Sequence, residues 1–333
     1  MSDVDCRTCL VTGAAGFIGS HLVDLLIGQG HSVVAVDNLM TGRRENLAQH
    51  DGNERFRFAD TDICNLDGMR DEMAGVHWVF HLAGLADIVP SIRQPLLYHR
   101  VNVDGTVAVL EAARAAGVQK LVYAASGSCY GADPITPTPE TAAIDPEYPY
   151  ALTKYLGERI ALHWGKVYDL PVVSLRLFNV YGPRSRTTGA YGAVFGVFLA
   201  QKLAGEPFTV VGDGTQSRDF TFVGDVVRAF QTAASADVAG EAFNIGSGGH
   251  YTVNRIVELL GGDRVAIPKR PGEPDVTFAD ATKFRTATDW KPEVAFDEGI
   301  AILLEHIDHW RDAPIWTPDS IADATEDWFR YLS

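Results

Sequence analysis

Short apolar runs alternate with helical patterns through the first half of the chain. Residues 33–36 and 172–176 are almost continuously apolar, which is typical of strands buried on both faces of a parallel sheet. Between such runs, apolar residues recur every three or four positions, which predicts amphipathic helices. The pattern therefore predicts an α/β fold with a doubly wound parallel sheet.

The expected elements can be placed by residue number. Strands are predicted over residues 8–12, 32–37, 56–59, 77–83, 120–125 and 171–178, and helices over 17–28, 95–116 and 150–164. Beyond about residue 180 the alternation breaks down and glycine and proline become frequent. We therefore expect a main domain over residues 1–180, completed by segments near 215–245. Residues 181–333 should form a smaller, mixed α/β lobe, interleaved with it, that carries ligand-binding loops.

The turn after the first predicted strand contains three glycines. Gly13, Gly16 and Gly19 follow that strand and open the first helix, which is the context of a dinucleotide fingerprint. The first glycine permits a tight turn, the second lets the backbone approach a pyrophosphate, and the third allows close helix packing. The helix amino terminus would meet the negative charge. The sequence thus predicts a Rossmann-type dinucleotide site.

Asp37 ends the next predicted strand and indicates which dinucleotide is bound. Its carboxylate can accept hydrogen bonds from both adenosine ribose hydroxyls and would repel a 2′-phosphate, so NAD is favoured over NADP. Arg43 and Arg44 lie a few residues further on and keep NADP open as an alternative, and Asp37 could instead belong to a solvated turn. After the third strand, Asp62 and Ile63 would suit the edge and face of adenine.

A tyrosine and a lysine lie four residues apart in the last predicted helix of this half. Tyr150 and Lys154 therefore share one helix face. A tyrosine needs a neighbouring cation to act as a base near neutral pH, and Lys154 could lower its pKa and hold a ribose hydroxyl. Beside a dinucleotide site this pair predicts alcohol oxidation. The spacing by itself also fits an ordinary surface pair.

Composition limits the kinds of partner. The 333 residues are 46% apolar and 21% charged, with a net charge of -15 and a pI near 5.0, which makes nucleic acids and anionic membranes poor partners. No apolar run is long enough to span a membrane, and the first residues lack the features of a secretory signal. We expect a cytoplasmic protein.

Four scattered cysteines indicate neither a disulfide framework nor a metal site. Cys6 and Cys9 have the spacing of half a zinc site, but no second pair exists. Residues three apart in a strand point to opposite faces. We interpret these cysteines as structural and expect no metal.

Taken together, these motifs make the chain resemble the extended short-chain dehydrogenase/reductase family. Within it, the chain is similar to the NAD-dependent nucleotide-sugar 4-epimerases, which act on UDP-glucose, UDP-N-acetylglucosamine or UDP-glucuronate. The resemblance covers essentially the whole length. It rests on the segments Thr12–Gly19, Asp37–Asn38, Asp62–Ile63, His81–Gly84, Asn102–Thr106, Ser126–Gly131, Tyr150–Lys154, Phe178–Pro183, Gly212–Phe220, Asn244–Gly246 and Arg270–Glu273.

The resemblance implies roles for individual residues. Tyr150 would be the base, Lys154 its activator and Ser126 a hydrogen-bond partner of the reacting hydroxyl. NAD would be bound by Gly13, Gly16, Phe17, Ile18, Gly19, Asp37, Asn38, Asp62, Ile63, Leu82, Ala83, Asn102, Tyr150 and Lys154. The nucleotide-sugar substrate would be bound by Ser128, Asn179, Arg186, Ala193, Val194, Arg218, Arg270, Glu273 and Thr277. For Arg218 the alternative is a salt bridge with Asp219.

The segment after Ser126 favours one reaction of this family over the others. Dehydratases and decarboxylases resemble one another in carrying Glu two residues before the tyrosine that matches Tyr130, whereas this chain has Ser126-Gly-Ser-Cys-Tyr130. That absence implies epimerisation at C4 of a UDP-sugar through a 4-keto intermediate. Dehydration, decarboxylation and reduction, which usually needs NADPH, remain alternatives. A catalytically silent NAD-binding regulatory protein is the alternative from another class, and loss of the tyrosine or lysine would indicate it.

The sugar itself is left open by the sequence. Thr277 occupies a position where the resemblance implies that a small residue admits an N-acetyl group. Arg186 matches an arginine of the uronate epimerases, although Arg184 and Arg186 could equally be loop or interface residues.

The assembly is also implied by the resemblance alone, as a homodimer formed through two helices. The residues concerned are Leu152, Leu156 and Ile160 on one helix and Val109, Leu110 and Ala113 on the other. These could equally be core residues.

Overall fold

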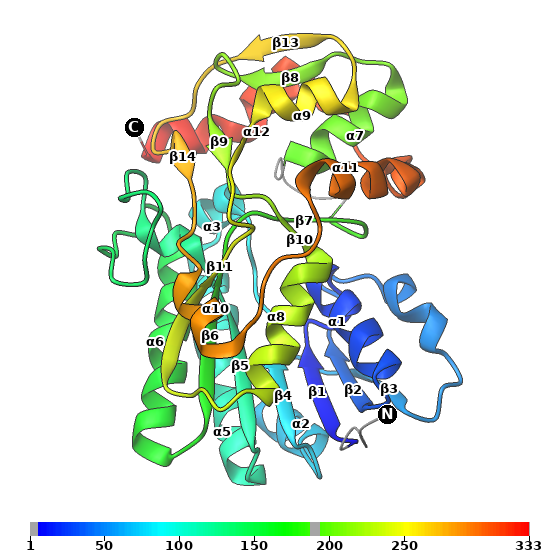
Figure 1. Ribbon diagram of the computed structural model, residues 1–333, viewed down its shortest axis with the longest axis vertical. Helices are drawn as coiled ribbons and strands as arrows, with labels where there is room; N and C mark the ends of the chain where they lie inside the picture. The colour runs from blue at the N-terminus through cyan, green and yellow to red at the C-terminus, as the bar shows by residue number, and fades with distance from the viewer. Residues whose placement is uncertain (1–5, 187–193, 333) are drawn as a thin grey trace.

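A seven-stranded parallel sheet forms the centre of the larger lobe (Figure 1). The computed structural model describes residues 6–186 and 194–332. The strand order is β11-β6-β5-β4-β1-β2-β3, and every neighbouring pair is parallel. The strands are β1 (Thr8–Thr12), β2 (Ser32–Asp37), β3 (Phe56–Asp60), β4 (Trp78–His81), β5 (Lys120–Ser126), β6 (Val172–Leu177) and β11 (Glu241–Ile245). The predicted Rossmann-type doubly wound fold is confirmed.

The order of the strands reverses between β1 and β4. From β1 the chain proceeds outward through β2 and β3, then returns to β4 on the other side of β1 and continues through β5 and β6. In open α/β sheets ligands bind at the carboxyl ends of the strands beside such a reversal. The glycine turn after β1 and the segment after β4 both lie there.

Successive residues of β1 alternate between the two faces of the sheet. Cys9 and Val11 belong to one apolar cluster, whereas Leu10 belongs to another, and all three are fully buried. Both faces must therefore be covered by helices, which explains why the strand is continuously apolar. Cys9 is thus a core residue, and both it and the exposed Cys6 are free thiols. The burial of Cys9 agrees with a structural role, whereas that of Cys6 stays a prediction.

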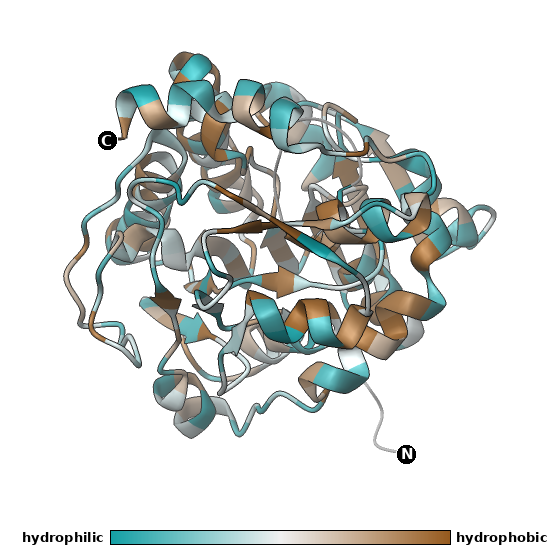
Figure 2. Cartoon of the chain, turned by 90° about the horizontal axis from the view of Figure 1, so that it is seen from above, coloured by the Kyte–Doolittle hydropathy of each residue, from teal (hydrophilic) through white to brown (hydrophobic). Residues whose placement is uncertain are grey.

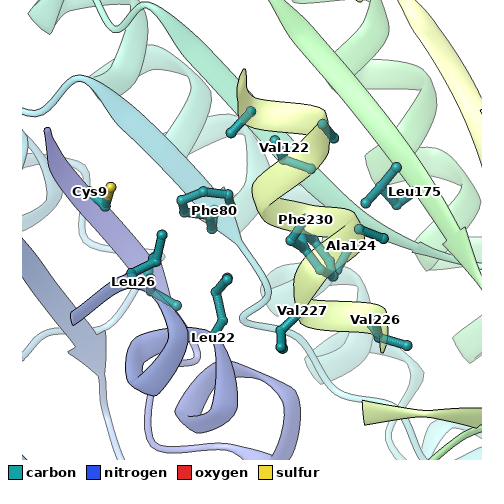
Figure 3. Packing of buried hydrophobic residues seen from close by; sticks show 14 of the residues in the cluster. Cys9, Leu22, Leu26, Phe80, Val122, Ala124, Leu175, Val226, Val227 and Phe230 are labelled. Carbon is teal, nitrogen blue, oxygen red and sulfur yellow. The ribbon is translucent and has the colours of Figure 1, made fainter. Parts of the chain in front are cut away.

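Helices cover each face of the sheet. On one side α1 (Phe17–Gly28) packs against α8 (Val223–Ser235), and Figure 3 shows Leu22 and Leu26 of α1 near Phe80 of the sheet and Phe230 of α8. On the other side lie α2 (Leu66–Glu72), α5 (Gly105–Ala116) and α6 (Pro149–Tyr168). Hydrophobic residues accordingly concentrate in the interior strands in Figure 2. Because α8 and β11 lie far along the chain, the sheet is completed by late segments.

The helix predicted over residues 95–116 is interrupted. It consists of α4 (Pro95–His99), the π-helical turn η2 (Arg100–Asp104) and α5. Asn102, in that turn, donates to and accepts from the backbone of Leu85 and donates to Thr153 Oγ1 on α6. The π turn aims this side chain across to two other segments. A periodicity argument could not detect it.

The C-terminal lobe lies beyond the carboxyl ends of the sheet (Figure 1). We use this name for the elements α7 (Val194–Ala204), β8 (Phe208–Val211), β9 (Ser217–Arg218), β12 (Tyr251–Thr252), α9 (Val253–Leu260), β13 (Arg264–Ile267), β14 (Val276–Thr277), α11 (Phe296–Glu305), η4 (Ile307–Trp310) and α12 (Pro318–Tyr331). Its own apolar cluster is rich in aromatic rings. The lobe is joined to the sheet through the two-stranded pair β7 (Val180–Tyr181) and β10 (Thr221–Phe222) and their flanking loops.

The remaining short elements connect these parts. They are η1 (Arg44–His50), α3 (Ile88–Arg93), η3 (Gly127–Tyr130) and α10 (Thr282–Thr288). Over the ranges 6–186 and 194–332, the helices are all too short or too polar to cross a membrane. In the same ranges, His, Cys, Asp and Glu side chains form no cluster that could hold a metal ion.

Candidate active site

One cavity of about 740 Å³ lies between the carboxyl ends of the strands and the C-terminal lobe. Its walls include the glycine turn, Asp37, Ser126, Tyr150 and Lys154 on the side of the sheet. The opposite wall includes Arg218, Arg270 and Glu273. The fold thus brings the cofactor, catalytic and substrate residues expected from the sequence into one space. The volume suits a site for small ligands.

The glycine turn has the geometry that a dinucleotide needs. Gly13 has φ = +66°, and a Cβ there would lie 2.8 Å from the backbone nitrogen of Ala83. A Cβ on Gly19 would lie 2.1 Å from the Gly13 carbonyl oxygen, so helix α1 could not approach the turn so closely with any other residue. Gly16 is the N-cap residue of α1 and has no side chain that could accept hydrogen bonds from the first N–H groups of the helix. The first turn of α1 contains no acidic residue. Its amides can therefore receive a phosphate.

Asp37 is fixed in the place expected for the ribose-binding carboxylate. It accepts the backbone N–H groups of Ala15 at 2.9 Å and Leu39 at 2.8 Å, and burial raises its pKa. Arg44 forms an ion pair with Asp51 and stacks over Phe58. Arg44, one of the two arginines that kept NADP open, is thus engaged elsewhere, whereas Arg43 is exposed.

Tyr150 and Ser126 meet inside the cavity. The Tyr150 hydroxyl donates to Ser126 Oγ at 3.3 Å, and Ser126 Oγ lies 2.8 Å from Ser128 Oγ. Ser126 is the last residue of β5, and Tyr150 is the second residue of α6. Two regular elements therefore keep the two hydroxyl groups close to each other. A substrate hydroxyl placed between these two oxygens could form hydrogen bonds to both.

Lys154 lies one turn after Tyr150 on α6. Its side chain is buried at 7% exposure, with Nζ 4.6 Å from the centroid of the Tyr123 ring. Burial lowers the pKa of the ammonium to about 8, although the Glu158 carboxylate one turn further on raises it. Lys154 is therefore a desolvated cation in the cavity wall. Such a cation interacts strongly with nearby charge because the local dielectric constant is low.

Burial dominates the pKa of the Tyr150 hydroxyl. Burial raises the pKa of its hydroxyl, hydrogen bonding to Ser126 lowers it, and the Asp87 carboxylate raises it. The net shift is upward. The surroundings as a whole therefore disfavour the phenolate in the protein by itself, and the role of Lys154 as activator of Tyr150 stays a prediction.

A cluster of charged side chains lines the opposite wall. Arg218 donates to Glu273 at 3.0 Å, and Arg270 donates to the same carboxylate at 2.8 and 3.2 Å. Asp219 instead accepts from Ser247 and Ala279. The alternative pairing of Arg218 with Asp219 is thus wrong, and two guanidinium groups converge on one carboxylate at the cavity surface.

The other expected substrate residues occupy varied positions. Thr277 donates to Asn179 Oδ1 at 2.9 Å, and both line the cavity, as does Val194. Ala193 lies outside the described residues. Arg186 lines the cavity and forms an ion pair with Asp87, whereas Arg184 pairs with Asp24.

The cofactor residues expected from the sequence line the cavity with one exception. Those present in its wall are Gly13, Gly16, Phe17, Ile18, Gly19, Asp37, Asn38, Asp62, Ile63, Leu82, Ala83, Tyr150 and Lys154. Asn102 is 1% exposed and is not part of that wall. Because its side chain holds the backbone of Leu85, it supports the loop after β4 instead.

The expected dimer surface is corrected in part. Val109, Leu110 and Ala113 of α5 are fully buried in the apolar cluster under the sheet. They are core residues and cannot contact a second copy. Leu152 of α6 is 44% exposed.

Several residues of the cavity wall were not recognised as site residues from the sequence, and three of them carry polar or aromatic groups that bear on the site. They are Asp87, Tyr148 and Trp328. The Tyr148 and Tyr150 rings stack with centroids 6.2 Å apart. No spacing rule points to Asp87 or Tyr148, whereas Trp328 belongs to an aromatic C-terminal stretch whose role the sequence left unexplained.

A buried polar network supports the site from behind. Arg176 on β6 pairs with Glu158 at 2.6 Å and donates to the Tyr130 hydroxyl at 2.7 Å. That hydroxyl in turn donates to Asn244 on β11. The network ties helix α6, which carries Tyr150 and Lys154, to the sheet. Fully satisfied networks of this kind rigidify a core.

Comparison with known proteins agrees with this geometry. The NAD dependent epimerase/dehydratase family matches residues 9–246. The chain belongs to this family. The cofactor of the family is NAD, which fits the glycine turn and Asp37 described above.

Relatives within the family include several UDP-sugar epimerases. The UDP-glucose 4-epimerase of Mycolicibacterium smegmatis is 40% identical over 89% of this chain and 97% of its own length. The solved UDP-glucose 4-epimerase of Thermotoga maritima with UDP-glucose is 36% identical, covers 90% of this chain and 98% of its own, and has a TM-score of 0.85.

Other activities occur among the relatives. UDP-glucuronic acid 4-epimerase from Bacillus cereus, solved with UDP-glucuronic acid and NAD, is 32% identical over 90% of this chain and 99% of its own, with a TM-score of 0.83. Relatives named dTDP-glucose 4,6-dehydratase and UDP-glucuronic acid decarboxylase match as well. The chain is thus an enzyme of this family, and its reaction must be argued from its own site.

Proposed function

We propose that this protein is an NAD-dependent 4-epimerase of UDP-hexoses. The observation that carries the proposal is the contact of Tyr150 with Ser126 inside a cavity whose far wall holds Arg218 and Arg270. One acid/base residue, one charged lysine and a diphosphate site are what a redox-neutral epimerisation requires of a protein. The similarity to UDP-glucose 4-epimerases supports the choice of nucleotide.

In this proposal three residues of the chain have separate roles in the reaction. Tyr150 takes the proton from the C4 hydroxyl, and Ser126 holds that hydroxyl by a hydrogen bond. Bound NAD supplies the hydride acceptor and donor, which protein side chains cannot supply. The Lys154 ammonium stabilises the phenolate of Tyr150 during the transfer. Once the keto sugar has turned its opposite face toward the cofactor, Tyr150 would return the proton to the oxygen at C4.

The segment after Ser126 argues against elimination of water. Gly127, Ser128 and Cys129 carry no carboxylate. Cys129 is buried, and burial raises the pKa of its thiol to about 12, so it stays protonated near neutral pH. No group in this segment can therefore remove a proton at C5. Epimerisation needs no such group.

The wall opposite the tyrosine supports a nucleoside diphosphate. Arg218 and Arg270 provide planar, permanently charged donors that match the geometry of a diphosphate. Glu273, between them, can also accept from ribose hydroxyls. The substrate would thus lie with its sugar at Tyr150 and its nucleotide in the C-terminal lobe.

A single assay tests the proposal. Purified protein, without added cofactor, is incubated with UDP-glucose, UDP-N-acetylglucosamine and UDP-glucuronate, and the sugars are analysed, with bound NAD measured by mass spectrometry. We expect a 4-epimer from UDP-glucose. Tyr150→Phe should lower the rate by about 10²–10⁴-fold while retaining NAD. Tyr168→Phe, on the exposed end of the same helix, is the matched control. Absence of any 4-epimer, or full activity of Tyr150→Phe, would refute the proposal.

We also propose that the protein forms homodimers through α6. Leu152 of α6 is exposed, and so is Leu96 of α4, a helix that packs against α6. Light scattering after size-exclusion chromatography tests this, and Leu152→Glu should shift the mass to that of a monomer. A monomeric wild type would exclude the dimer without affecting the catalytic proposal.

A further inference from the structure

The C-terminal helix α12 carries a tryptophan into the cavity wall. Trp328 is 6% exposed, and its indole N–H donates to the Pro271 carbonyl at 2.7 Å. The guanidinium carbon of Arg270 lies 4.9 Å from the centroid of its ring. The same side chain thus holds both Arg270 and the backbone of the next residue. The proline-glycine turn after Arg270 is thereby fastened to α12.

The helix that carries Trp328 is itself held on two sides. Ile321 packs in a cluster with Val211 and Ile267 of the C-terminal lobe. Asp327 pairs with Arg93 at the end of α3 at 2.5 Å, and α12 packs along α3. Helix α3 belongs to the loop region after β4, on the side of the sheet. The position of Trp328 is therefore defined by both lobes.

The position of the Arg270 guanidinium over the Trp328 ring suits an arginine that binds a diphosphate. An aromatic ring contacts the face of a guanidinium group, whereas hydrogen bonds leave through its edges. Glu273 receives two of these edge bonds and also accepts from Arg218. The ring thus restrains the rotamers of Arg270 and excludes water from one face without consuming N–H donors. Restraint before binding lowers the entropy lost when a ligand is bound.

We propose that Trp328 is a positioning residue that holds Arg270 in the orientation that binds the diphosphate of the substrate. The inference rests on the proposed function, because it assumes that Arg270 contacts a nucleoside diphosphate. It assigns a role to the aromatic C-terminal stretch. It also makes α12 part of the substrate site although none of its residues reacts.

The test compares binding and turnover in the wild type and three variants. UDP is titrated by calorimetry into the purified holoprotein, and kcat and KM are measured with UDP-glucose. We expect Trp328→Leu to weaken UDP binding and raise KM by about tenfold, as for loss of one desolvated cation–π contact, with kcat changed less than about twofold. Trp328→Phe, which keeps a ring, should recover most of the affinity. Phe329→Leu alters the next, more exposed residue of the same helix and is the matched control.

A double-mutant cycle separates positioning from general support of the lobe. In an Arg270→Met background, Trp328→Leu should weaken UDP binding no further, because its effect passes through Arg270. Equal weakening with and without Arg270 would overturn the proposal, as would unchanged UDP binding in Trp328→Leu. Circular dichroism and bound NAD content show whether Trp328→Leu is folded. If it is not, UDP binding by Trp328→Phe, and a cycle that combines Trp328→Tyr with Arg270→Met, replace it in the test. A wild-type protein that binds no UDP would overturn the proposed function together with this inference, whereas UDP binding that is indifferent to Trp328 would overturn this inference alone.

Discussion

Asp87 and Arg186 form an ion pair in the wall of the cavity. Both line its wall, and Asp87 also acts electrostatically on Tyr150, so the pair lies close to the reacting centre. A uronate would bring its C6 carboxylate toward a guanidinium group that already has a carboxylate partner. Neutral hexoses meet no such competition. We therefore expect Arg186, while it is paired with Asp87, to favour neutral hexoses over uronates, and its role as a substrate ligand stays a prediction.

The first prediction concerns sugar selectivity. Asp87→Asn removes the competing charge and keeps the side-chain size, so Arg186 can receive a substrate carboxylate. We expect the ratio of kcat/KM for UDP-glucuronate to that for UDP-glucose to rise by about tenfold, because tenfold corresponds to about 1.4 kcal/mol, a modest ionic contribution. Asp24→Asn breaks the pair with Arg184, outside the cavity wall, and should leave the ratio unchanged. A ratio that stays constant in Asp87→Asn would contradict this account.

The second prediction follows from the desolvated ammonium of Lys154. Its folded pKa, about 8, lies below the ordinary value of 10.5, so below pH 8 both states are protonated and the folded state bears the full cost of burial. That cost, about 3 kcal/mol, falls as pH rises from 8 to 10.5, because the folded protein releases the proton first. Lys154→Met should therefore be more stable than wild type at pH 7, and the difference should shrink by pH 10.

Urea unfolding of the NAD-free protein at the two pH values measures this difference. Lys154→Met should also be inactive, since the cation that supports the phenolate is lost. Lys166→Met, on the exposed part of the same helix, is the control and should show no pH-dependent gain. If Lys154→Met were less stable than wild type at pH 7, the favourable contacts of the ammonium would contribute more free energy than its desolvation costs.

The third prediction concerns the buried pair Arg176 and Glu158. Arg176→Met leaves the Glu158 carboxylate buried without its partner, which typically costs about 3–5 kcal/mol of unfolding free energy. The double variant Arg176→Met/Glu158→Gln removes both charges and should recover much of that loss. Arg114→Met breaks a more exposed pair with Glu111 and should cost far less, because solvent screens an exposed ion pair. Urea unfolding compares the four proteins, and similar losses in the buried and exposed pairs would argue against this role of the network.

The fourth prediction concerns the cofactor. Asp37→Ala should weaken NAD binding and reduce discrimination against NADP, because the carboxylate that would repel a 2′-phosphate is gone. Fluorescence titration of protein freed of its cofactor gives both affinities. Asp60→Ala alters the residue paired with Asp37 on the neighbouring strand, and it should leave the NAD/NADP ratio nearly unchanged. Unchanged discrimination in Asp37→Ala would mean that another residue excludes the phosphate.

Local sequence signals were sufficient where the structure depends on neighbours in the chain. The strands over 8–12 and 32–37 and the helix over 17–28 have the predicted limits, because glycine turns and apolar periodicity act within a few residues. The helix predicted over 95–116 does not, because its π turn is stabilised by Asn102 reaching the loop after β4 and α6. The strand predicted over 77–83 ends at His81, since the next two N–H groups turn to the hydroxyl of Thr12.

The sequence by itself determined the doubly wound sheet, the glycine turn, Asp37 at the end of its strand, and the Tyr150/Lys154 helix face. Each of these features depends on residues that are close together along the chain. Only the tertiary structure decided which charges meet: Asp87 with Arg186, Arg270 with Glu273 and Trp328, and Arg176 with Glu158. The physical reason is that electrostatic and aromatic contacts act over a few ångströms in space. The fold therefore brings together side chains that are far apart in the sequence.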